Sequence, residues 1–586
     1  MILDKICIEN FKSIKDVKIK IQDKTILVGA NNCGKSNILE AINILFGEKN
    51  PNYMEPKKSD FNDLATDIVL IAFLTDISTK DLKLIGCSKD KINRIITPAM
   101  QQAGHEAVFR LNIQLKSLVQ NTDPNSVRID AVRYYEMDNE CYRNGFGNGS
   151  EGIRKKLCSF VMIPTIRNIQ DELRVNNWTT FGKLIKEIVK LSPHRTAVIQ
   201  KLMESQNELN SLLSEEKNEI ENNVKNYTPI DEIIFSIAKT NEPEEILENL
   251  QMLVKTGQFT TDISRMGTGT QSAIIIAILD AYRKKNAGCL GKQVAPTVPL
   301  TLLAFEEPEL YLHPHGQRKI QKTIDELIKI TEIKTQVIFS THAPILLRNL
   351  NIPQITKIIK NNNGETQVLQ LALNQIEDID AFKFKNLVNT EIAEIWFADK
   401  IIICEGGDAY ILKAIASIQN YSIDEKNVSI IPTGGNCKFS DIGKVLERMS
   451  NEVIIITDND SLVSNKNNAR NQIKEILQEK IKKIAQTDPD YNRLNDLINS
   501  LSNISSANPQ NLIDNLSEFG VFILPIGNND LEACYSQTAK SLDGVSTNAK
   551  ERSALIIAEE MMKNSNISNY LTFTKTFENA LEFSCR

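Results

Sequence analysis

Apolar residues along this chain follow two different spacings, which divide it into segments. Near the N-terminus, helical spacing predicts a helix over 35–46, and short apolar runs predict strands. These strands are expected at 2–9, 16–21, 24–28 and 67–76. Further strands are predicted at 298–306 and 336–341, and a second alternation of strands and helices begins at Asp399. Strands that alternate with helices are typical of α/β folds, so we expect two α/β units.

The segment 155–255 has a different pattern. Glycine is scarce there, charged residues are dense, and apolar residues recur at helical spacing, as in FGKLIKEIVKL and EEILENLQMLV. We interpret this segment as a helical insertion, which is either a solvated bundle or an arm through which two chains associate. The chain then divides into an N-terminal unit in two parts, 1–154 and 256–394, and a C-terminal unit, 395–586.

Composition excludes some classes of protein. The 586 residues are 41% hydrophobic and 24% charged, which is ordinary for a globular protein with several domains. No apolar stretch is long enough for a transmembrane helix, and the charged N-terminus argues against a signal peptide. The 10 cysteines form no CxxC pair, which argues against zinc and favours a cytoplasmic protein with free thiols. The net charge of −6 still allows a local basic groove for DNA.

Residues 29–36 (GANNCGKS) match the phosphate-binding pattern G-x-x-x-x-G-K-[ST]. They follow a predicted buried strand and open a predicted helix, which is the context that the pattern requires. Backbone N–H groups of such a loop surround phosphate oxygens, and the helix N-terminus adds a favourable dipole. We expect Lys35 to face the β- and γ-phosphates of ATP and Ser36 to bind Mg²⁺. The predicted ATP-binding residues of this loop are Gly29, Asn31, Asn32, Gly34, Lys35 and Ser36.

The sequence LLAFEEPE at 302–309 ends an apolar strand with carboxylates. Glu306 is placed to hold the Mg²⁺ that accompanies ATP, and Glu307 is placed to polarise the attacking water. A second apolar strand ends in Ser-Thr-His, where we expect His342 to bond the γ-phosphate. An exposed acidic turn and a structural histidine are the plainer alternatives.

The segment 264–272 (SRMGTGTQS) places small residues before a predicted helix. Ser264, Gly267 and Gly269 suit phosphate binding at a helix N-terminus, although an ordinary N-cap has the same pattern. In the order of its phosphate loop, small-residue signature, EEPE and histidine, the chain resembles the ABC ATPases of the SMC and RecF type. This resemblance implies that two chains enclose ATP between them, so we expect a homodimer or a higher homo-oligomer, with the insertion as the favoured dimerisation arm.

Three predicted strands of the C-terminal unit end in acidic or glycine-rich turns. These turns are Glu405-Gly406-Gly407-Asp408, Thr433-Gly434-Gly435 and Asp458-Asn459-Asp460. The carboxyl ends of parallel strands meet at one edge of a sheet, where ligands bind. Carboxylates gathered there repel one another unless a divalent cation joins them, and oxygen-only ligands suit Mg²⁺ or Mn²⁺. A metal-free, flavodoxin-like domain is the alternative.

The acidic residue before glycine and the later Asp-x-Asp resemble the Toprim domain. The sequence Asn529-Asp530-Leu531-Glu532 resembles an additional acidic motif of the OLD-family nucleases, which join an ABC ATPase to a Toprim domain in this order. Gabija-type and retron-associated defence nucleases are similar. The resemblance implies catalytic roles for the acidic residues that end the strands and a set of metal ligands. The implied ligands are Glu405, Asp408, Asp458, Asp460 and Glu532.

The first acidic turn departs from the OLD pattern at one position. OLD sequences usually place an acidic residue four positions after the first glutamate, whereas this chain has Ala409 there and Asp408 one position earlier. Chemistry with one metal ion or with two therefore stays open. Lys438 and Lys550 are candidates for a general base or a transition-state cation, and the basic segment 466–483 is a candidate for a phosphate-facing helix. Solvated surface positions are the alternative for each of them.

The motifs together predict an ATP-regulated, metal-dependent DNA endonuclease or nickase. The resemblance implies a role in defence against phage, away from any membrane. It also implies a partner, either a helicase or a reverse transcriptase with its nucleic acid. A DNA clamp or sensor without nuclease activity is the second hypothesis. A signalling module whose Toprim domain cleaves RNA or binds a partner is the third.

Overall fold

The computed structural model describes most of the chain. The residues outside the description are 48–50, 52–53, 97–105, 120–124, 135–140, 146–150, 164–196, 198–199, 202–203, 205–252, 257–258, 263–266, 268–273, 275–297, 311–313, 330–333, 348–349, 378–392, 436–437, 450, 460–461, 463–467, 502–508, 525–529, 547–548 and 586. No helix in the described part is long and apolar enough to cross a membrane.

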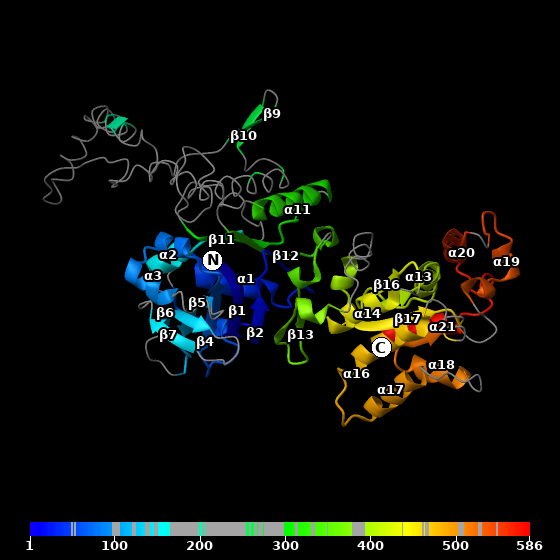
Figure 1. The fold of residues 1–586 in the computed structure, drawn as a ribbon. Coiled ribbons are helices and arrows are strands. Elements are labelled where there is room, and N and C mark those ends of the chain that lie inside the picture. The colour runs from blue at the N-terminus through cyan, green and yellow to red at the C-terminus, as the bar shows by residue number, and fades with distance from the viewer. Residues whose placement is uncertain are drawn as a thin grey trace, which may run out of the picture. The chain divides into compact units, whose positions relative to one another are not determined.

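The described residues separate into two units, and Figure 1 shows their elements coloured by residue number. The first unit comprises Met1–Lys12, Ile21–Lys24 and Ser36–Thr341. The second comprises Ser13–Lys20, Thr25–Lys35 and His342–Arg586. The boundary therefore passes through the predicted phosphate loop and its helix, so that each unit carries part of the predicted nucleotide-binding motifs.

An antiparallel sheet is the larger sheet of the first unit. Its strands, in their order across the sheet, are β1 (Ile2–Phe11), β4 (Ile68–Thr75), β5 (Glu106–Leu115), β6 (Asn125–Tyr134) and β7 (Cys141–Gly145). Residues along β4 alternate between buried and partly exposed, as expected for a sheet with one face against a core. The sequence analysis predicted β1 and β4 but no element between 106 and 145.

Three parallel strands form a second layer of this unit. Strand β11 (Leu300–Glu306) lies between β8 (Cys158–Ile163) and β12 (Lys334–Ser340), and Glu306 is paired with Ser340 at the strand ends. The last residue of β11 is thus a carboxylate at the carboxyl edge, as the sequence predicted. The unit also contains α2 (Thr79–Leu84), α3 (Lys89–Ile95), α5 (Glu151–Leu157), α11 (Pro314–Ile328) and the hairpin β9–β10 (Leu253–Thr256, Phe259–Asp262).

The predicted helical insertion 155–255 begins with the last residues of α5 and contains strands near both of its ends. Cys158–Ile163 belongs to the parallel layer, and Leu253–Thr256 begins a hairpin. The prediction of a helix was wrong over Cys158–Ile163, because the apolar run CSFVMI has no spacing that separates a buried strand from a buried helix. Most of 164–252 lies outside the described residues, so the dimerisation arm stays a prediction.

A buried arginine closes the C-terminus of α1 (Lys35–Phe46), the helix that follows the phosphate loop. The last carbonyl groups of a helix have no partner within it. Arg154 is 1% exposed, and its guanidinium donates to the carbonyl oxygens of Ile44 at 2.9 Å and Gly47 at 2.8 Å. This cap joins α1 to α5, which lies far from it in the sequence.

The second unit contains a group of three paired strands and the four-stranded C-terminal sheet. In the group of three, β13 (Ile355–Lys360) runs parallel to β3 (Lys24–Val28) and antiparallel to β14 (Thr366–Leu369). All five residues of β3 are buried, which fixes the strand that leads into the phosphate loop. Strand β2 (Ile14–Lys20) and the short helices η5 (Pro344–Leu347), η6 (Ile352–Gln354) and η7 (Leu373–Gln375) belong to the same unit.

The C-terminal sheet has four parallel strands in the order β16 (Val428–Pro432), β15 (Lys400–Cys404), β17 (Glu452–Thr457) and β18 (Val521–Ile523). Residues 402 and 404 of β15 face a core built with α13 (Asp408–Ile418), α20 (Lys550–Asn564) and α21 (Lys575–Cys585). Residues 401 and 403 are also fully buried, as in a parallel sheet covered on both faces. The remaining helices are η8 (Ala393–Trp396), α14 (Phe439–Arg448), α16 (Ala469–Ile481), α17 (Pro489–Ser500), α18 (Pro509–Ser517), η11 (Leu531–Cys534) and α19 (Gln537–Lys540).

Arg154→Met should destabilise the first unit, because it leaves the buried carbonyls at the end of α1 without their charged donor. We expect a loss on the order of 3 kcal/mol, measured as a fall in the first transition of a calorimetric melt. The matched control is Lys156→Met, because Lys156 lies on the same helix and is exposed. Equal melting temperatures for the two variants would show that the cap contributes nothing.

Candidate nucleotide site and acidic centre

The phosphate loop has a backbone that only glycine fits at two positions. Gly29 has a φ of +150°, and a Cβ there would lie 2.1 Å from the Ile358 carbonyl oxygen. Gly34 has a φ of +113°, and its Cβ would lie 2.2 Å from Thr366 Oγ1. Asn32 between them adopts a left-handed φ of +61°. The loop therefore turns tightly against β13 and β14, which is the shape that exposes backbone N–H groups to an anion.

The Lys35 ammonium group lies over this loop. Its Nζ donates to the carbonyl oxygens of Gly29 at 2.9 Å and Ala30 at 2.8 Å, and the residue is buried. A lysine held in this position brings a positive charge to the place where the motif binds phosphate. The described loop thus fits a nucleotide triphosphate, as the sequence predicted.

Ser36, the next residue, contacts the carboxylate that ends β11. Its hydroxyl donates to Glu306 Oε1. A hydroxyl and a carboxylate in contact with each other offer oxygen ligands of the kind that Mg²⁺ binds beside nucleotide phosphates. The pair therefore fits the predicted metal ion of the nucleotide site.

Glu307 has a backbone conformation that is unusual for a residue with a side chain. Its φ is +48°, in the left-handed region. The conformation is held because its N–H donates to the carbonyl oxygen and the hydroxyl of Ser340, at 3.1 and 3.2 Å. Non-glycine residues in this region concentrate at functional sites. The geometry agrees with a specific role for Glu307. Its role as a general base stays a prediction.

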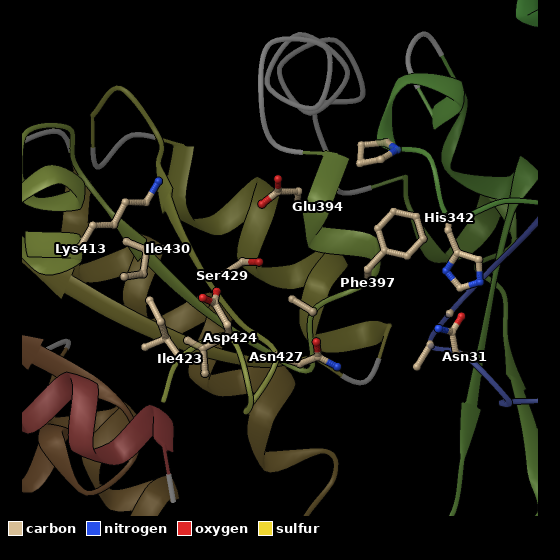
Figure 2. Close-up of a pocket in the computed structure, with 15 residues that line it drawn as sticks. Asn31, His342, Glu394, Phe397, Lys413, Ile423, Asp424, Asn427, Ser429 and Ile430 are labelled. Atoms are coloured by element: carbon tan, nitrogen blue, oxygen red, sulfur yellow. The ribbon is translucent and has the colours of Figure 1, made fainter. Parts of the chain in front are cut away.

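His342 follows β12 and borders the phosphate loop. Burial, and then the charge of Lys35, lower the pKa of His342, so its imidazole is neutral at neutral pH. The ring stacks on Phe397, with centroids 6.1 Å apart and planes inclined by 23°. Both residues line a cavity of about 750 Å³ together with Gly29–Asn31, and Figure 2 shows Asn31 beside the imidazole.

The small-residue signature is the least described part of the nucleotide motifs. Gly267 is exposed, and nothing lies within 4 Å of the position of its Cβ. Ser264 and Gly269 lie outside the described residues. Their contact with the nucleotide of a second chain stays a prediction.

The acidic centre begins with two neighbouring strands of the C-terminal sheet. Glu405 directly follows β15 and Asp458 directly follows β17, and the two strands pair in parallel. Thr457, the last residue of β17, donates its hydroxyl to Glu405 Oε1 at 2.8 Å. This bond aims the Glu405 carboxylate at the end of the neighbouring strand.

The first acidic turn contains Asp408 as a second acidic residue besides Glu405. It begins α13 and is 5% exposed. Burial, and then the charges of Glu405 and Glu532, raise the pKa of Asp408 to about 7. Ala409, at the position where OLD sequences carry an acidic residue, is buried in the hydrophobic core instead. The loop thus places its acidic side chain one residue earlier, beside the other carboxylates.

Two further carboxylates lie on η11. Asp530 caps this short helix by accepting from the Ala533 N–H at 3.0 Å. Glu532 forms an ion pair with Lys550 at 2.9 Å, and Asp530 lies 3.6 Å from the same ammonium group. Burial, and then the charges of the surrounding carboxylates, raise the pKa of the Cys534 thiol to about 12. Those carboxylates are Asp458, Asp408, Asp530 and Glu532, so they all surround one buried thiol.

Helix α20 covers the first acidic turn, which the sequence did not reveal. A Cβ on Gly406 would lie 3.1 Å from Glu551 Oε1, and one on Gly407 would lie 2.7 Å from the Ala554 Cβ. The glycines therefore permit the close approach of a helix from the end of the chain. That approach brings Lys550, at the start of α20, to the acidic centre.

Lys438 also lies at this edge of the sheet. It is the N-cap of α14, and its Nζ lies 3.5 Å from the Cβ position of Gly434. The glycine turn is joined to the first acidic turn because the Gly435 N–H donates to the Glu405 carbonyl oxygen at 2.8 Å. Lys438 and Lys550 are therefore both near the acidic centre.

The acidic centre fits a divalent cation by its chemistry. Its donors are carboxylates, and burial, followed by the negative charges of Glu405 and Glu532, raises the pKa of Asp408. In the part of the chain that the structure describes, no three histidine, cysteine or acidic residues stand close enough to hold an ion as they are. Asp460 lies outside that part. The individual metal ligands therefore stay predictions.

Comparisons with known proteins cover both sites. A family model described as AAA ATPase domain matches residues 1–347, and one described as Overcoming lysogenization defect protein-like, TOPRIM domain matches 396–460. The OLD nuclease of Thermus scotoductus (strain ATCC 700910 / SA-01) is 21% identical over 486 residues, which are 78% of this chain and 82% of that protein. Endonuclease GajA of Bacillus cereus (strain HuB5-5) is 22% identical over 485 residues, which are 69% and 65% of the two chains.

A likeness to solved structures covers a similar part of the chain. The SMC head bound to the C-terminal winged-helix domain of ScpA covers 65% of this chain and 100% of its own, with 16% identity and a TM-score of 0.37.

Asp408→Asn should stabilise the protein at about pH 8 without divalent cations, by an amount on the order of a few kcal/mol. The raised pKa means that the folded chain keeps a proton that the unfolded chain has released. This carboxyl therefore makes its full contribution to stability when the pH is below the pKa that it has in the unfolded chain. That contribution is lost as the pH rises through about 7. The advantage of Asn should shrink at about pH 5, which calorimetric melts at the two pH values can measure.

Mn²⁺ provides the second half of that test. It should stabilise the parent and the exposed control Asp514→Asn but not Asp408→Asn, because the variant lacks one charged oxygen. Equal stabilisation of all three proteins by Mn²⁺ would remove Asp408 from the set of metal ligands.

Proposed function

This chain belongs to the AAA ATPase domain family and carries an OLD-like Toprim domain, and from that premise we propose that it is an ATP-regulated, divalent-metal-dependent DNA endonuclease. The family models agree with the predicted order of an α/β ATPase followed by an α/β Toprim domain. The relatives named OLD nuclease and endonuclease GajA support nuclease activity for this chain. The observation that carries the proposal is the gathering of Glu405, Asp408, Asp458 and Glu532 at one sheet edge.

The acidic centre suits phosphodiester hydrolysis better than passive DNA binding. Carboxylates repel the phosphates of DNA, so a clamp would be weakened by the four that surround the buried Cys534 thiol, which are Asp408, Asp458, Asp530 and Glu532. When bound, a divalent cation supplies Lewis acidity toward water and the scissile phosphate. Glu405 and Asp458 would hold this cation from adjacent strand ends, with Asp408, Glu532 and the predicted Asp460 as further ligands.

The two lysines near the centre would act on the substrate. Lys438 and Lys550 carry positive charge at an edge that is otherwise acidic, so either could neutralise a phosphate as negative charge develops on it. Lys550 is held beside Glu532 by the ion pair already described. We assign Lys438 the catalytic role and Lys550 the role of orienting Glu532.

The nucleotide site would control access to this centre. Lys35 would bind the triphosphate, and Ser36 with Glu306 would hold its Mg²⁺. Glu307 would polarise the water that attacks the γ-phosphate, and the neutral imidazole of His342 would donate to that phosphate. Each chain has one phosphate loop and one signature, so we propose a homodimer in which the signature residues Ser264, Gly267 and Gly269 complete the partner's site.

The finer assignments extend this function. We propose Mg²⁺ or Mn²⁺ as the cation, and cleavage or nicking of duplex DNA during defence against phage, alongside a helicase or reverse transcriptase. The support is the likeness to an endonuclease named GajA and the oxygen-only donor set. A DNA clamp or sensor is the competing function, and it predicts DNA binding without cleavage.

Asp458→Ala and Lys35→Ala should have opposite effects in two assays on the same proteins. Asp458→Ala removes a charged ligand from the acidic centre, so plasmid cleavage with Mn²⁺ should fall by a factor on the order of 100 or more, while ATP binding is kept. Lys35→Ala should abolish ATP binding and keep metal-dependent cleavage. ATP binding is measured by isothermal titration and cleavage on agarose gels.

The control for these variants is Asp514→Ala, an exposed aspartate on α18 that should leave both assays unchanged. Undiminished cleavage by Asp458→Ala would refute the nuclease centre and favour the clamp. RNA cleavage in place of DNA cleavage would change the substrate but not the site.

A further inference from the structure

The ring pair of His342 and Phe397 lies beside the phosphate loop, shortly before β15, the strand that Glu405 directly follows. Figure 2 shows the imidazole beside the phenyl ring at the wall of the cavity that Gly29–Asn31 also line. Phe397 directly follows η8, and β15 begins only three residues later. The ring pair therefore lies beside the phosphate loop, and Phe397 lies three residues before the first strand of the C-terminal sheet.

The backbone next to Phe397 is held from two sides. The carbonyl oxygen of Ala398 accepts from Asn451 Nδ2 at 2.6 Å and from Lys357 Nζ at 3.2 Å. Asn451 immediately precedes β17, while Lys357 is on β13, the strand that pairs with β3. Both donors are buried, with 1% and 3% exposed. A displacement of Phe397 would therefore act on a junction shared by the nucleotide-binding sheet and the nuclease sheet.

The neighbour of Phe397 is anchored more firmly than Phe397 itself. Trp396 is fully buried, whereas the Phe397 ring lies partly exposed at the cavity wall. A side chain at a cavity wall has room to change its position, which a close-packed core side chain lacks. The partly exposed ring of Phe397 therefore has room to follow His342, which the buried ring of Trp396 lacks.

We propose that Phe397 is a positioning residue, which transmits the nucleotide state from His342 to the Ala398 junction and so to the Glu405 end of β15. The inference rests on one part of the proposed function, which is nucleotide binding at the phosphate loop. Contact of the γ-phosphate with the imidazole would change the geometry of the ring pair, and aromatic pairs favour particular geometries, so Phe397 would adjust its position. Coupling of this kind acts within one chain.

Tryptophan fluorescence tests this inference without any nuclease assay. The chain has two tryptophans, so Trp178→Phe leaves Trp396 as the one reporter, next to Phe397. In this background, a non-hydrolysable ATP analogue with Mg²⁺ should change the fluorescence of Trp396. Phe397→Leu keeps an apolar side chain but removes the ring, so the change should become smaller by on the order of fivefold or more, with the analogue still bound.

Further variants separate coupling from folding. Phe397→Tyr keeps the ring and should respond like the parent, and Ile423→Ala, on another wall of the same cavity, should do so too. His342→Leu removes the other ring and should lose the response as Phe397→Leu does. In plasmid cleavage, Phe397→Leu should reduce the effect of ATP on the rate by a similar factor, on the order of fivefold, while cleavage without ATP persists.

The outcomes distinguish this inference from the proposed function. A full response of Trp396 in Phe397→Leu, or a parent that binds the analogue with no response, would overturn the coupling and leave the nuclease proposal standing. A parent that does not bind the analogue would overturn the proposed nucleotide site and the coupling with it. A normal fluorescence response in a protein that cuts no DNA would uphold the coupling and reject the nuclease.

Discussion

Mutual repulsion of carboxylates at the carboxyl edge of the four-stranded sheet is the constraint on which the rest of this molecule depends. Glu405 and Asp458 are carried there by adjacent parallel strands, and Asp408 is buried beside them with a raised pKa. Folding cannot avoid this repulsion, because the strand directions fix where each acidic turn lies. A bound cation relieves it, and hydrolysis of a phosphodiester is the chemistry that a cation at such an edge supports.

The phosphate loop has the opposite requirement, because it needs a negatively charged ligand. Its backbone donors and Lys35 require an anion, and its two glycines hold a shape that any Cβ would destroy. The chain thus contains a cationic loop for a triphosphate and an acidic edge for a cation. A regulated nuclease needs these two sites to have different chemistry and to be connected through the structure. The Ala398 junction, bonded by Lys357 and Asn451, offers such a connection.

Local motifs were predictable from sequence, while contacts between distant segments were not. The phosphate loop, Glu306 and Glu405 lie at strand ends that an apolar run reveals, so their positions were predicted correctly. Folding brings the hydroxyl of Thr457 to Glu405 and brings the covering helix α20 to Gly406. Neither contact follows from the local sequence. The sequence showed the shift of the acidic position from 409 to 408, and only the fold shows that Ala409 lies in the core while Asp408 lies beside the other carboxylates. The prediction of a helix over Cys158–Ile163 was wrong, because an apolar run buried on both faces carries no periodicity.

The most direct measurement of the central claim is a titration of divalent metal against cleavage of supercoiled plasmid by the full chain. The protein should leave the plasmid intact in a metal chelator and convert it to open-circular or linear DNA when Mg²⁺ or Mn²⁺ is added. Cleavage should rise with metal concentration to a plateau, because the acidic edge must bind the ion before hydrolysis can occur. Cleavage that persists in the chelator, or plasmid that stays supercoiled at every metal concentration with and without ATP, would contradict the account.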